Sequence, residues 1–321
     1  MIRYGILGAA RIARAFAREK PGNAEIAAIA SRDIEKAKDF AREFQIPTAY
    51  GSYEELVQDK TIDAVYISLP HHMHHEYTIR CADVGKHVLC EKPATLSVKE
   101  MVEMDAACKK NGVLFMEAFM YRFLPVHRRV KELVDKGKIG KLRYINFNFC
   151  IDLKSQVLGT FRGEKEAGGG ALYDLGVYGI NLSRYMTGRE PEVLESRIHR
   201  ETPDSMDELT FVTLRLGNVI SRIACSYTTF AYSYTVSGDK GVIHVPTGNT
   251  GKMIENKLIF TPQGDYSEDI EIFAAMSGYR AQAEYFAECI EKGEVPILNG
   301  EDSVRQLRVV EAVLEKEKPL F

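Results

Sequence analysis

Short runs of apolar residues alternate with amphipathic stretches through the first third of the chain. The runs have the length and β-branched content of buried strands, and the stretches repeat their apolar positions with a helical period. The strands predicted in this way are residues 2–7, 25–30, 62–69, 87–90 and 113–116. The helices predicted between them are residues 11–20, 34–44, 72–84 and 97–111. This alternation predicts a parallel sheet covered on both faces by crossover helices.

After about residue 120 the pattern changes to long strands in which polar and apolar positions alternate. The strands predicted here are residues 142–153, 193–200, 208–216, 219–230, 232–237, 242–245 and 257–261. Turn signals such as Gly217-Asn218 and Gly238-Asp239 separate several of them, which is typical of antiparallel hairpins. The predicted helices are residues 126–136, 170–186, 276–292 and 303–317. The second part is therefore predicted to be α+β.

Two domains follow from these patterns. Residues 1–119 are predicted to form an α/β Rossmann dinucleotide-binding domain, and residues 120–321 a substrate-binding and oligomerisation α+β domain with a large, mainly antiparallel open sheet. Such a sheet, without helical cover on both faces, must bury its second face in another way. A partner subunit does this economically, so we expect a homodimer or higher homo-oligomer.

Composition narrows the class of protein. With 321 residues, 45% hydrophobic content and a formal charge of −3, the chain can bury a large core, and its charge favours neither nucleic acid nor an acidic membrane surface. No apolar stretch approaches the roughly 20 residues that cross a bilayer. Arg11 and Arg14 follow the first apolar run too soon for a secretory signal. The six cysteines lack a CxxC pair, so we expect reduced thiols and a cytoplasmic location.

A glycine turn lies between the first predicted strand and the first helix, in the sequence GILGAARIA. Gly8 allows a tight turn and close backbone approach, and the helix start at Ala10, Arg11 and Ile12 presents N–H groups to a pyrophosphate. Ala10 replaces the second glycine of the GxGxxG pattern and narrows that approach. A turn that binds nothing is the alternative.

The end of the second strand indicates which dinucleotide binds. Ser31, Arg32 and Lys36 offer donors and positive charge where an NAD-specific site has an acidic residue. These groups suit a 2′-phosphate, so NADP is the predicted cofactor, with NAD as the alternative. Asp33 is expected to cap the following helix. A solvated charge cluster is the other interpretation.

The sequence GKHVLCEKP places Glu91 and Lys92 where a buried strand ends. Parallel sheets bind ligands at that edge, so Lys92 is a candidate catalytic group. A surface lysine before a helix is the plainer alternative. The nearby histidines His71, His72, His74 and His75 have spacing that zinc sites use, but only Glu76 offers an acidic ligand, so no metal site is predicted.

Several motifs together resemble the Gfo/Idh/MocA oxidoreductases, and most closely their branch of dimeric dihydrodiol and NADP-dependent xylose dehydrogenases. They are GILGAARIA, ASRDIEKA, IDAVYISLPHHMH, GKHVLCEKP, MEAFMYRF and GGGALYDLGVYGIN. The resemblance covers nearly the whole chain and weakens after about residue 190.

The resemblance also implies roles for single residues. Lys92 would contact the nicotinamide ribose and the substrate hydroxyl, Asp174 would hydrogen-bond the substrate, and Tyr178 would be the acid/base. The loop over the cofactor would comprise Leu69, Pro70, His71 and His74. The role of Asn181, where relatives often have aspartate, stays open, as does substrate recognition by Arg122 or Arg162.

The chemistry of alcohol oxidation agrees with these residue types. The hydroxyl proton must leave as the hydride leaves carbon, so a base with an adjustable pKa must reach that oxygen. A free tyrosine has a pKa near 10, and a lysine ammonium and an oxidised nicotinamide beside it lower that pKa. Tyr178 is therefore the first candidate for the acid/base, with Lys92 as its electrostatic activator or as the proton carrier itself. Structural packing remains the alternative for Tyr178 and Asp174.

The predicted function is an NAD(P)-dependent oxidoreductase, with NADP preferred, acting on a secondary alcohol or ketone of a sugar, polyol or dihydrodiol. Two alternatives stay open. The first is an enzyme that retains its nicotinamide and uses transient oxidation for elimination or glycoside cleavage. The second is a non-catalytic nucleotide or sugar sensor on the same scaffold.

Overall fold

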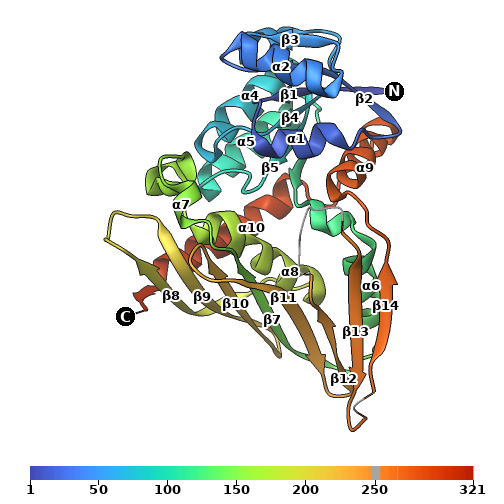
Figure 1. The fold of residues 1–321 in the computed structure, drawn as a ribbon, viewed down its shortest axis with the longest axis vertical. Coiled ribbons are helices and arrows are strands. Elements are labelled where there is room, and N and C mark those ends of the chain that lie inside the picture. Colours follow the sequence, from blue (N-terminus) through green and yellow to red (C-terminus); the bar gives the residue numbers. More distant parts are fainter. Residues whose placement is uncertain (248–253, 266, 321) are drawn as a thin grey trace. The chain divides into compact units, whose positions relative to one another are not determined.

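The computed structural model describes residues 1–247, 254–265 and 267–320, and the chain forms two compact units. The first unit comprises Met1–Met120 and Ser277–Val304, and the second comprises Tyr121–Met276 and Arg305–Phe321. Each unit has its own sheet (Figure 1). The described residues contain no helix that is both long and apolar enough to span a membrane. All six cysteines are free and buried.

The first unit is built on a six-stranded sheet in the order β3-β2-β1-β4-β5-β6, with every neighbouring pair parallel. Its strands are β1 Ile2–Leu7, β2 Ala24–Ala30, β3 Thr48–Tyr50, β4 Ala64–Ile67, β5 His87–Glu91 and β6 Phe115–Ala118. Its helices are α1 Arg11–Arg18, α2 Ile34–Phe44, α3 Tyr53–Gln58, α4 His74–Asp83, α5 Val98–Lys110 and α9 Gly278–Lys292. Helix α10, Gly300–Glu315, begins in this unit and ends in the second. The predicted Rossmann class is confirmed.

The second unit is built on a nine-stranded sheet in the order β14-β13-β12-β11-β7-β10-β9-β8-β15. The strands are β7 Leu142–Cys150, β8 Glu192–Arg200, β9 Asp207–Leu216, β10 Val219–Ser226, β11 Ala231–Gly238, β12 Gly241–Val245, β13 Asn256–Pro262, β14 Asp269–Phe273 and β15 Glu317–Pro319. Its other helices are α6 Pro125–Asp135, α7 Lys154–Val157 and α8 Val177–Thr187. Helix α8 packs on β7, β9 and β10, where Gly179 lies against Phe147 and Ile223.

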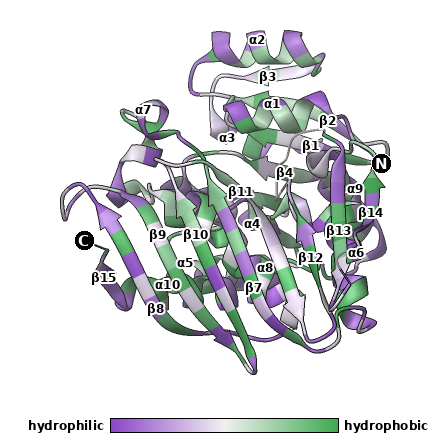
Figure 2. Ribbon diagram, turned by 60° about the horizontal axis from the view of Figure 1, so that its bottom comes forward, coloured by the Kyte–Doolittle hydropathy of each residue, from purple (hydrophilic) through white to green (hydrophobic). Residues whose placement is uncertain are grey.

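The second sheet is mixed and mainly antiparallel, in agreement with the sheet predicted from the sequence. Most neighbouring strands are antiparallel, but β7 with β10 and β8 with β15 are parallel pairs. Alternation of polar and apolar residues shows which residues share a face and carries no information about strand direction. Figure 2 shows that alternation of hydrophilic and hydrophobic positions along β8, β9, β10 and β7.

The units divide the chain differently from the boundary expected at residues 119 and 120. The first crossing does fall there, between Met120 and Tyr121, but Ser277–Val304 packs with the first unit. Helix α9 joins that unit because the Tyr4 hydroxyl donates to the carbonyl of Ala283 at 2.8 Å, and the Glu284 carboxylate accepts from the N–H of Gly22 at 2.7 Å. The order of the predicted elements did not indicate that this later segment packs with the first unit.

The helix predicted over residues 170–186 also differs in detail. Its first part, Leu172–Gly176, is a π-helical turn that leads into α8. A π turn has more residues per turn than an α-helix. Asp174 and Tyr178 are therefore not related by the regular i, i+4 spacing of an uninterrupted α-helix.

Candidate functional site

The predicted cofactor residues of the first unit lie after the carboxyl ends of neighbouring strands. Gly8 follows β1, Ser31 follows β2, Leu69 follows β4 and Lys92 follows β5. The strand order reverses between β1 and β4, and open parallel sheets bind ligands beside such a switch point. The parallel pairing thus brings the sequence motifs to one edge of the sheet.

The glycine turn has the geometry that close backbone approach requires. Gly8 has φ +100°, and a Cβ on it would lie 3.0 Å from Leu69 Cδ2 and 3.3 Å from the Ser68 carbonyl oxygen. The Ser68 hydroxyl lies 2.9 Å from the carbonyl oxygens of both Leu7 and Gly8, which ties the turn to the end of β4. The first N–H groups of α1 receive no side-chain cap from Ala10. The turn therefore offers uncapped helix donors, and Arg11 and Ile12 are the first residues of that helix.

At the end of β2, the three predicted phosphate ligands differ in their surroundings. Ser31 is buried and its Oγ accepts from the N–H of Asp33 at 3.2 Å, so its own proton remains able to donate. Arg32 and Lys36 are exposed, and Lys36 lies 3.8 Å from the Asp33 carboxylate. Asp33 accepts from the N–H groups of Glu35 and Lys36 and caps α2, as predicted.

The loop after β4 is fixed by a fully buried histidine. The ring nitrogens of His74 lie 2.8 Å from the Leu69 carbonyl oxygen and 3.0 Å from that of Pro93. Burial lowers the pKa of His74 to about 4, so the ring is neutral at pH 7 and its one N–H donates to one of these carbonyls. His74 therefore links the Leu69–Pro70 loop to the turn after β5. His71 is also buried.

Lys92 lies in a buried turn that several side chains hold. The Glu91 carboxylate accepts from the Tyr66 hydroxyl at 2.6 Å and from the N–H of Lys92 at 3.3 Å. On the other side of the turn, Glu117 of β6 accepts from the N–H of Ala94 at 2.9 Å. Only 9% of Lys92 is exposed, so it is not the surface lysine of the plainer interpretation. The backbone around it is fixed on both sides.

Glu117 is itself held, because its second carboxylate oxygen accepts from the Ser303 hydroxyl at 2.6 Å. Its 1% exposure makes these contacts important, since a buried carboxylate needs hydrogen-bond donors. In the sequence, Glu117 is only a part of the MEAFMYRF motif, and no role is predicted for it. A charged residue inside an otherwise apolar strand was the available signal.

In the second unit, Asp174 lies in the π turn and is nearly buried. Its Oδ2 accepts from the Tyr227 hydroxyl at 3.0 Å and lies 3.3 Å from Nε of Arg162. Arg162, a candidate for substrate recognition, therefore pairs with Asp174. Tyr227, which sequence reasoning missed, is fully buried, and burial raises its pKa well above the usual value. It is therefore a permanent donor to Asp174 at neutral pH.

Tyr178 lies in the first turn of α8 with 5% of its surface exposed. Its ring packs 5.9 Å from that of Tyr121 and 5.4 Å from that of Phe149. One turn on, the Asn181 side-chain oxygen accepts from the Tyr121 hydroxyl at 2.6 Å and lies 3.4 Å from Arg122 Nη1. Asn181 thus has a structural role beneath Tyr178.

The histidine cluster shows contacts to protein groups. His75 lies 2.8 Å from the Glu103 carboxylate, and His74 contacts the two carbonyls described above. Among the residues that the structure describes, no group of three or more His, Cys, Asp or Glu side chains could hold a metal ion.

A parallel sheet of this strand order, with a glycine turn at its switch point and a buried lysine after β5, defines a dinucleotide-binding oxidoreductase domain. The chain belongs to the Gfo/Idh/MocA oxidoreductase family. The family model for the NAD-binding Rossmann fold matches residues 2–119, and that for the Gfo/Idh/MocA C-terminal domain matches residues 127–244. The resemblance inferred from the sequence motifs is confirmed.

Individual relatives match over nearly their whole length. D-xylose 1-dehydrogenase (NADP(+)) 2 of Haloferax volcanii is 34% identical, over 97% of this chain and 96% of its own. The trans-1,2-dihydrobenzene-1,2-diol dehydrogenase of Xenopus laevis is 33% identical, over 91% and 89%. The 3-ketoreductase KijD10 of Actinomadura kijaniata, solved with NADP and TDP-benzene, superimposes with a TM-score of 0.90 at 29% identity, over 99% and 98%.

Proposed function

We propose that the protein is an NADP-dependent dehydrogenase or reductase that transfers a hydride between the nicotinamide and a secondary alcohol or ketone of a sugar, polyol or dihydrodiol. The buried turn around Lys92 carries this proposal, because contacts from Tyr66, His74 and Glu117 hold the residues on both sides of this lysine. The relatives named above, which are xylose and dihydrodiol dehydrogenases and a ketoreductase, support the substrate class.

The residues of the first unit fit NADP. Gly8 leaves open the space that a Cβ would fill, the α1 N-terminus lacks a side-chain cap, and Ser31 and Arg32 supply donors for a 2′-phosphate. Asp33, the acidic residue available to a ribose hydroxyl, is engaged by the N–H groups of α2. Leu69, Pro70, His71 and Glu91 complete the proposed cofactor contacts, and His74 acts by holding their loop.

The proton is proposed to be handled by two residues. The oxidised cofactor, when bound, would supply the hydride acceptor for the carbinol carbon. In that direction Tyr178, as phenolate, takes the substrate's hydroxyl proton, and the Lys92 ammonium stabilises the phenolate. Asp174, with Tyr227 and Arg162 fixing its Oδ2, accepts a hydrogen bond from a second substrate hydroxyl. Reduction of a ketone uses the same groups in reverse.

The test is a screen of aldoses, polyols and dihydrodiols that follows NADPH absorbance, and then kinetics of Lys92→Ala on the substrate found. We expect kcat to fall at least about 100-fold, the scale of general acid–base contributions. Lys99→Ala, an exposed lysine of α5, is the matched control and should leave kcat unchanged. If kcat of Lys92→Ala falls less than about threefold, the role is excluded, because so small a loss lies well below the general acid–base contribution. A nicotinamide that stays bound through gel filtration and turns over without net NADPH indicates the retained-cofactor alternative.

We further propose that the protein is a homo-oligomer and that a second copy covers the open face of the second sheet. On this face, Asn146, Phe211 and Arg222 line a hollow of about 380 Å³, and Phe211 is 38% exposed. A mixture of polar and apolar side chains is typical of interfaces between subunits. Light scattering should give at least a dimeric mass. Phe211→Asp should reduce that mass, and Lys99→Asp, at an exposed position of α5 outside this sheet, should not.

A further inference from the structure

Asp207 is a buried carboxylate outside the residues considered so far. It is the first residue of β9 in the second unit, with 2% of its surface exposed. Burial raises its pKa, although Thr210, Arg200 and the N–H of Leu172 act in the opposite direction. A buried carboxylate destabilises the folded protein unless hydrogen bonds and nearby charges compensate for its lost hydration. The contacts of Asp207 therefore indicate its role.

The contacts of Asp207 are to the start of the helix that carries the candidate catalytic residues. Its Oδ2 accepts from the N–H of Leu172 at 2.7 Å and from the Thr210 hydroxyl at 2.7 Å. Leu172 opens the π turn, and the residue before it, Ala171, provides no side-chain cap. Asp207 therefore supplies from a strand the cap that the helix sequence lacks.

The backbone before the helix is shaped to receive this carboxylate. Gly170 has φ +110°, and a Cβ on it would lie 1.9 Å from Asp207 Oδ1. Any other residue at position 170 would displace the carboxylate. The Gly170 carbonyl also accepts from the N–H of Asp174 at 3.2 Å, so the capped turn leads directly to that residue.

A second link joins the same strands to Asp174. The N–H of Tyr227 donates to the carbonyl of Glu208, the neighbour of Asp207, at 2.8 Å, while the Tyr227 hydroxyl donates to Asp174. The start of the helix and the Asp174 carboxylate are thus both held by contacts that lead to the beginning of β9. A movement of one shifts the other.

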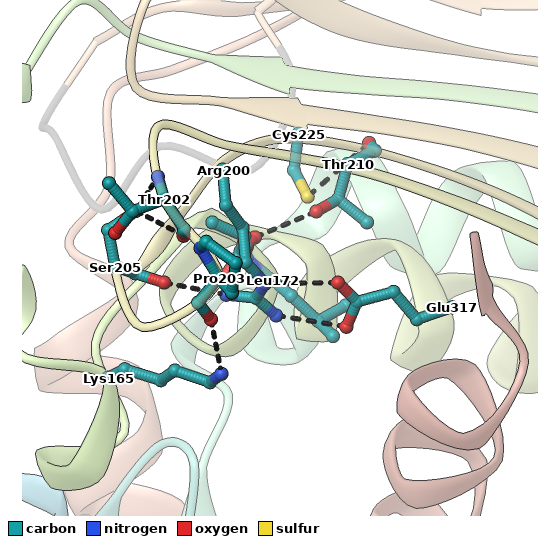
Figure 3. A network of polar contacts seen from close by, with 10 residues as sticks. Lys165, Leu172, Arg200, Thr202, Pro203, Ser205, Thr210, Cys225 and Glu317 are labelled. Atoms are coloured by element: carbon teal, nitrogen blue, oxygen red, sulfur yellow. Dashed lines mark hydrogen bonds and ion pairs between the residues drawn. The ribbon is translucent and has the colours of Figure 1, made fainter. Parts of the chain in front are cut away.

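Arg200 provides a positive charge close to the Asp207 carboxylate. Arg200 pairs with Asp207 across β8 and β9, and its Nη1 lies 4.0 Å from the Asp207 carboxylate. Its Nε and Nη2 donate to Glu317 of β15 at 3.0 and 3.1 Å. Figure 3 shows Arg200 between Ser205 and Glu317, with Leu172 and Thr210 close by.

We propose that Asp207 is a positioning residue for the reaction, which caps the Leu172–Gly176 turn from β9 and thereby fixes Asp174 and Tyr178 for the substrate. This inference rests on the proposed function. It assigns no contact with substrate or cofactor to Asp207.

The test compares Asp207→Ala and Asp207→Asn in the full-length protein. Asp207→Ala removes the acceptor, so amide hydrogen exchange of the Leu172–Tyr178 peptide should rise. Its kcat should fall about 100-fold, the cost of a misplaced catalytic group, with a raised KM and a displaced pH profile. NADPH affinity, measured by fluorescence, should stay within about twofold, a change well below one hydrogen bond. Asp207→Asn keeps an acceptor for Leu172 and should restore protection and most of kcat.

The matched control is Asn256→Ala, a buried polar residue of β13 in the same unit, whose side chain hydrogen-bonds to the Thr247 hydroxyl and to the Ile254 carbonyl. It should lose stability without changing kcat, KM or the pH profile. The proposal is overturned if Asp207→Ala raises hydrogen exchange yet keeps wild-type kcat and pH profile, or if Asn256→Ala has the same kinetic effect. Absence of turnover in the wild type instead refutes the proposed function, and this is seen before any variant is compared.

Discussion

At the scale of single residues, the proposed preference for NADP rests on a few exposed charges after β2. Removing the Arg32 guanidinium takes away the donor best suited to a 2′-phosphate, because arginine matches phosphate oxygens with two parallel N–H groups. Wild-type protein should bind NADPH more tightly than NADH in fluorescence titrations. Arg32→Ala should reduce that preference about 10-fold, the scale of one charged hydrogen bond. Arg42→Ala, an exposed arginine in the last turn of α2, serves as the control. Equal dissociation constants for the two cofactors in the wild type contradict NADP preference.

Two buried histidines make stability depend on pH. Burial lowers the pKa of His74 to about 4 and that of His127 to about 3, against 6.5 in an unfolded chain. Between pH 6.5 and 4 the unfolded chain therefore binds protons at these positions that the folded chain does not. The contribution of these histidines to the free energy of unfolding is fully present above pH 6.5. It is lost on acidification, by about 1.4 kcal/mol per pH unit for each imidazole.

The measurement is urea unfolding at several pH values between 6.5 and 4.5, a window above both folded pKa values. His127→Gln should make the dependence shallower by about 1 kcal/mol per pH unit. The exposed His72→Gln should leave it unchanged. An identical slope in wild type and His127→Gln would falsify the assignment.

At the scale of elements, α8 packs on its sheet through a glycine. A Cβ on Gly179 would lie 2.6 Å from Phe147 Cδ1 and 2.7 Å from Ile223 Cγ2. Gly179→Ala gains about 1 kcal/mol of helix propensity, but overpacking costs about 1–3 kcal/mol. We expect a net loss of up to about 2 kcal/mol in urea unfolding. The loss should shrink in an Ile223→Ala background, where one contact is gone. A gain in stability from Gly179→Ala contradicts this packing.

The sequence predicted elements well where apolar runs are long and bounded. The strand at Ile2–Leu7 and the helix at Ile34–Phe44 have the predicted limits. The short strand β3 and helix α3 were missed, although Ser52 and Glu55 form a capping box that was visible in the sequence. Strand β15 was missed because Glu317–Pro319 has no strand pattern and depends on its pairing with β8.

Much of the candidate site could be predicted from motifs in the sequence, and not from the length of apolar runs. Motifs such as GKHVLCEKP are contiguous in the chain, so Lys92 could be singled out from its neighbours. The residues that hold these motifs come from distant segments. Glu117 supports the turn at Ala94, and Tyr227 supports Asp174, through contacts that only the folded chain creates. Local patterns carry no signal for such pairs.

At the scale of the whole molecule, the first unit is not one continuous segment. Helix α9 buries Tyr279 and Phe286 and packs on β1, β2 and β5. A fragment of residues 1–120 should therefore lack a cooperative urea transition. Because Gly278 lies close to the Met120 carbonyl, a short linker can join residues 277–304 to residue 120, and this fragment should unfold cooperatively. Phe286→Asp in the joined fragment is the control and should abolish the transition. Cooperative unfolding of the shorter fragment contradicts the assignment of α9 to this unit.

The late position of α9 also has a consequence for biosynthesis. Domains generally fold as units while the ribosome delivers the chain from its N-terminus. Here β1 is made first, yet the segment that accepts the Tyr4 hydroxyl is made only after residues 121–276. The nascent first unit must therefore wait, with the part of its sheet that α9 covers still exposed, until most of the polypeptide has been synthesised. Chaperones that shield apolar surface would act during that interval.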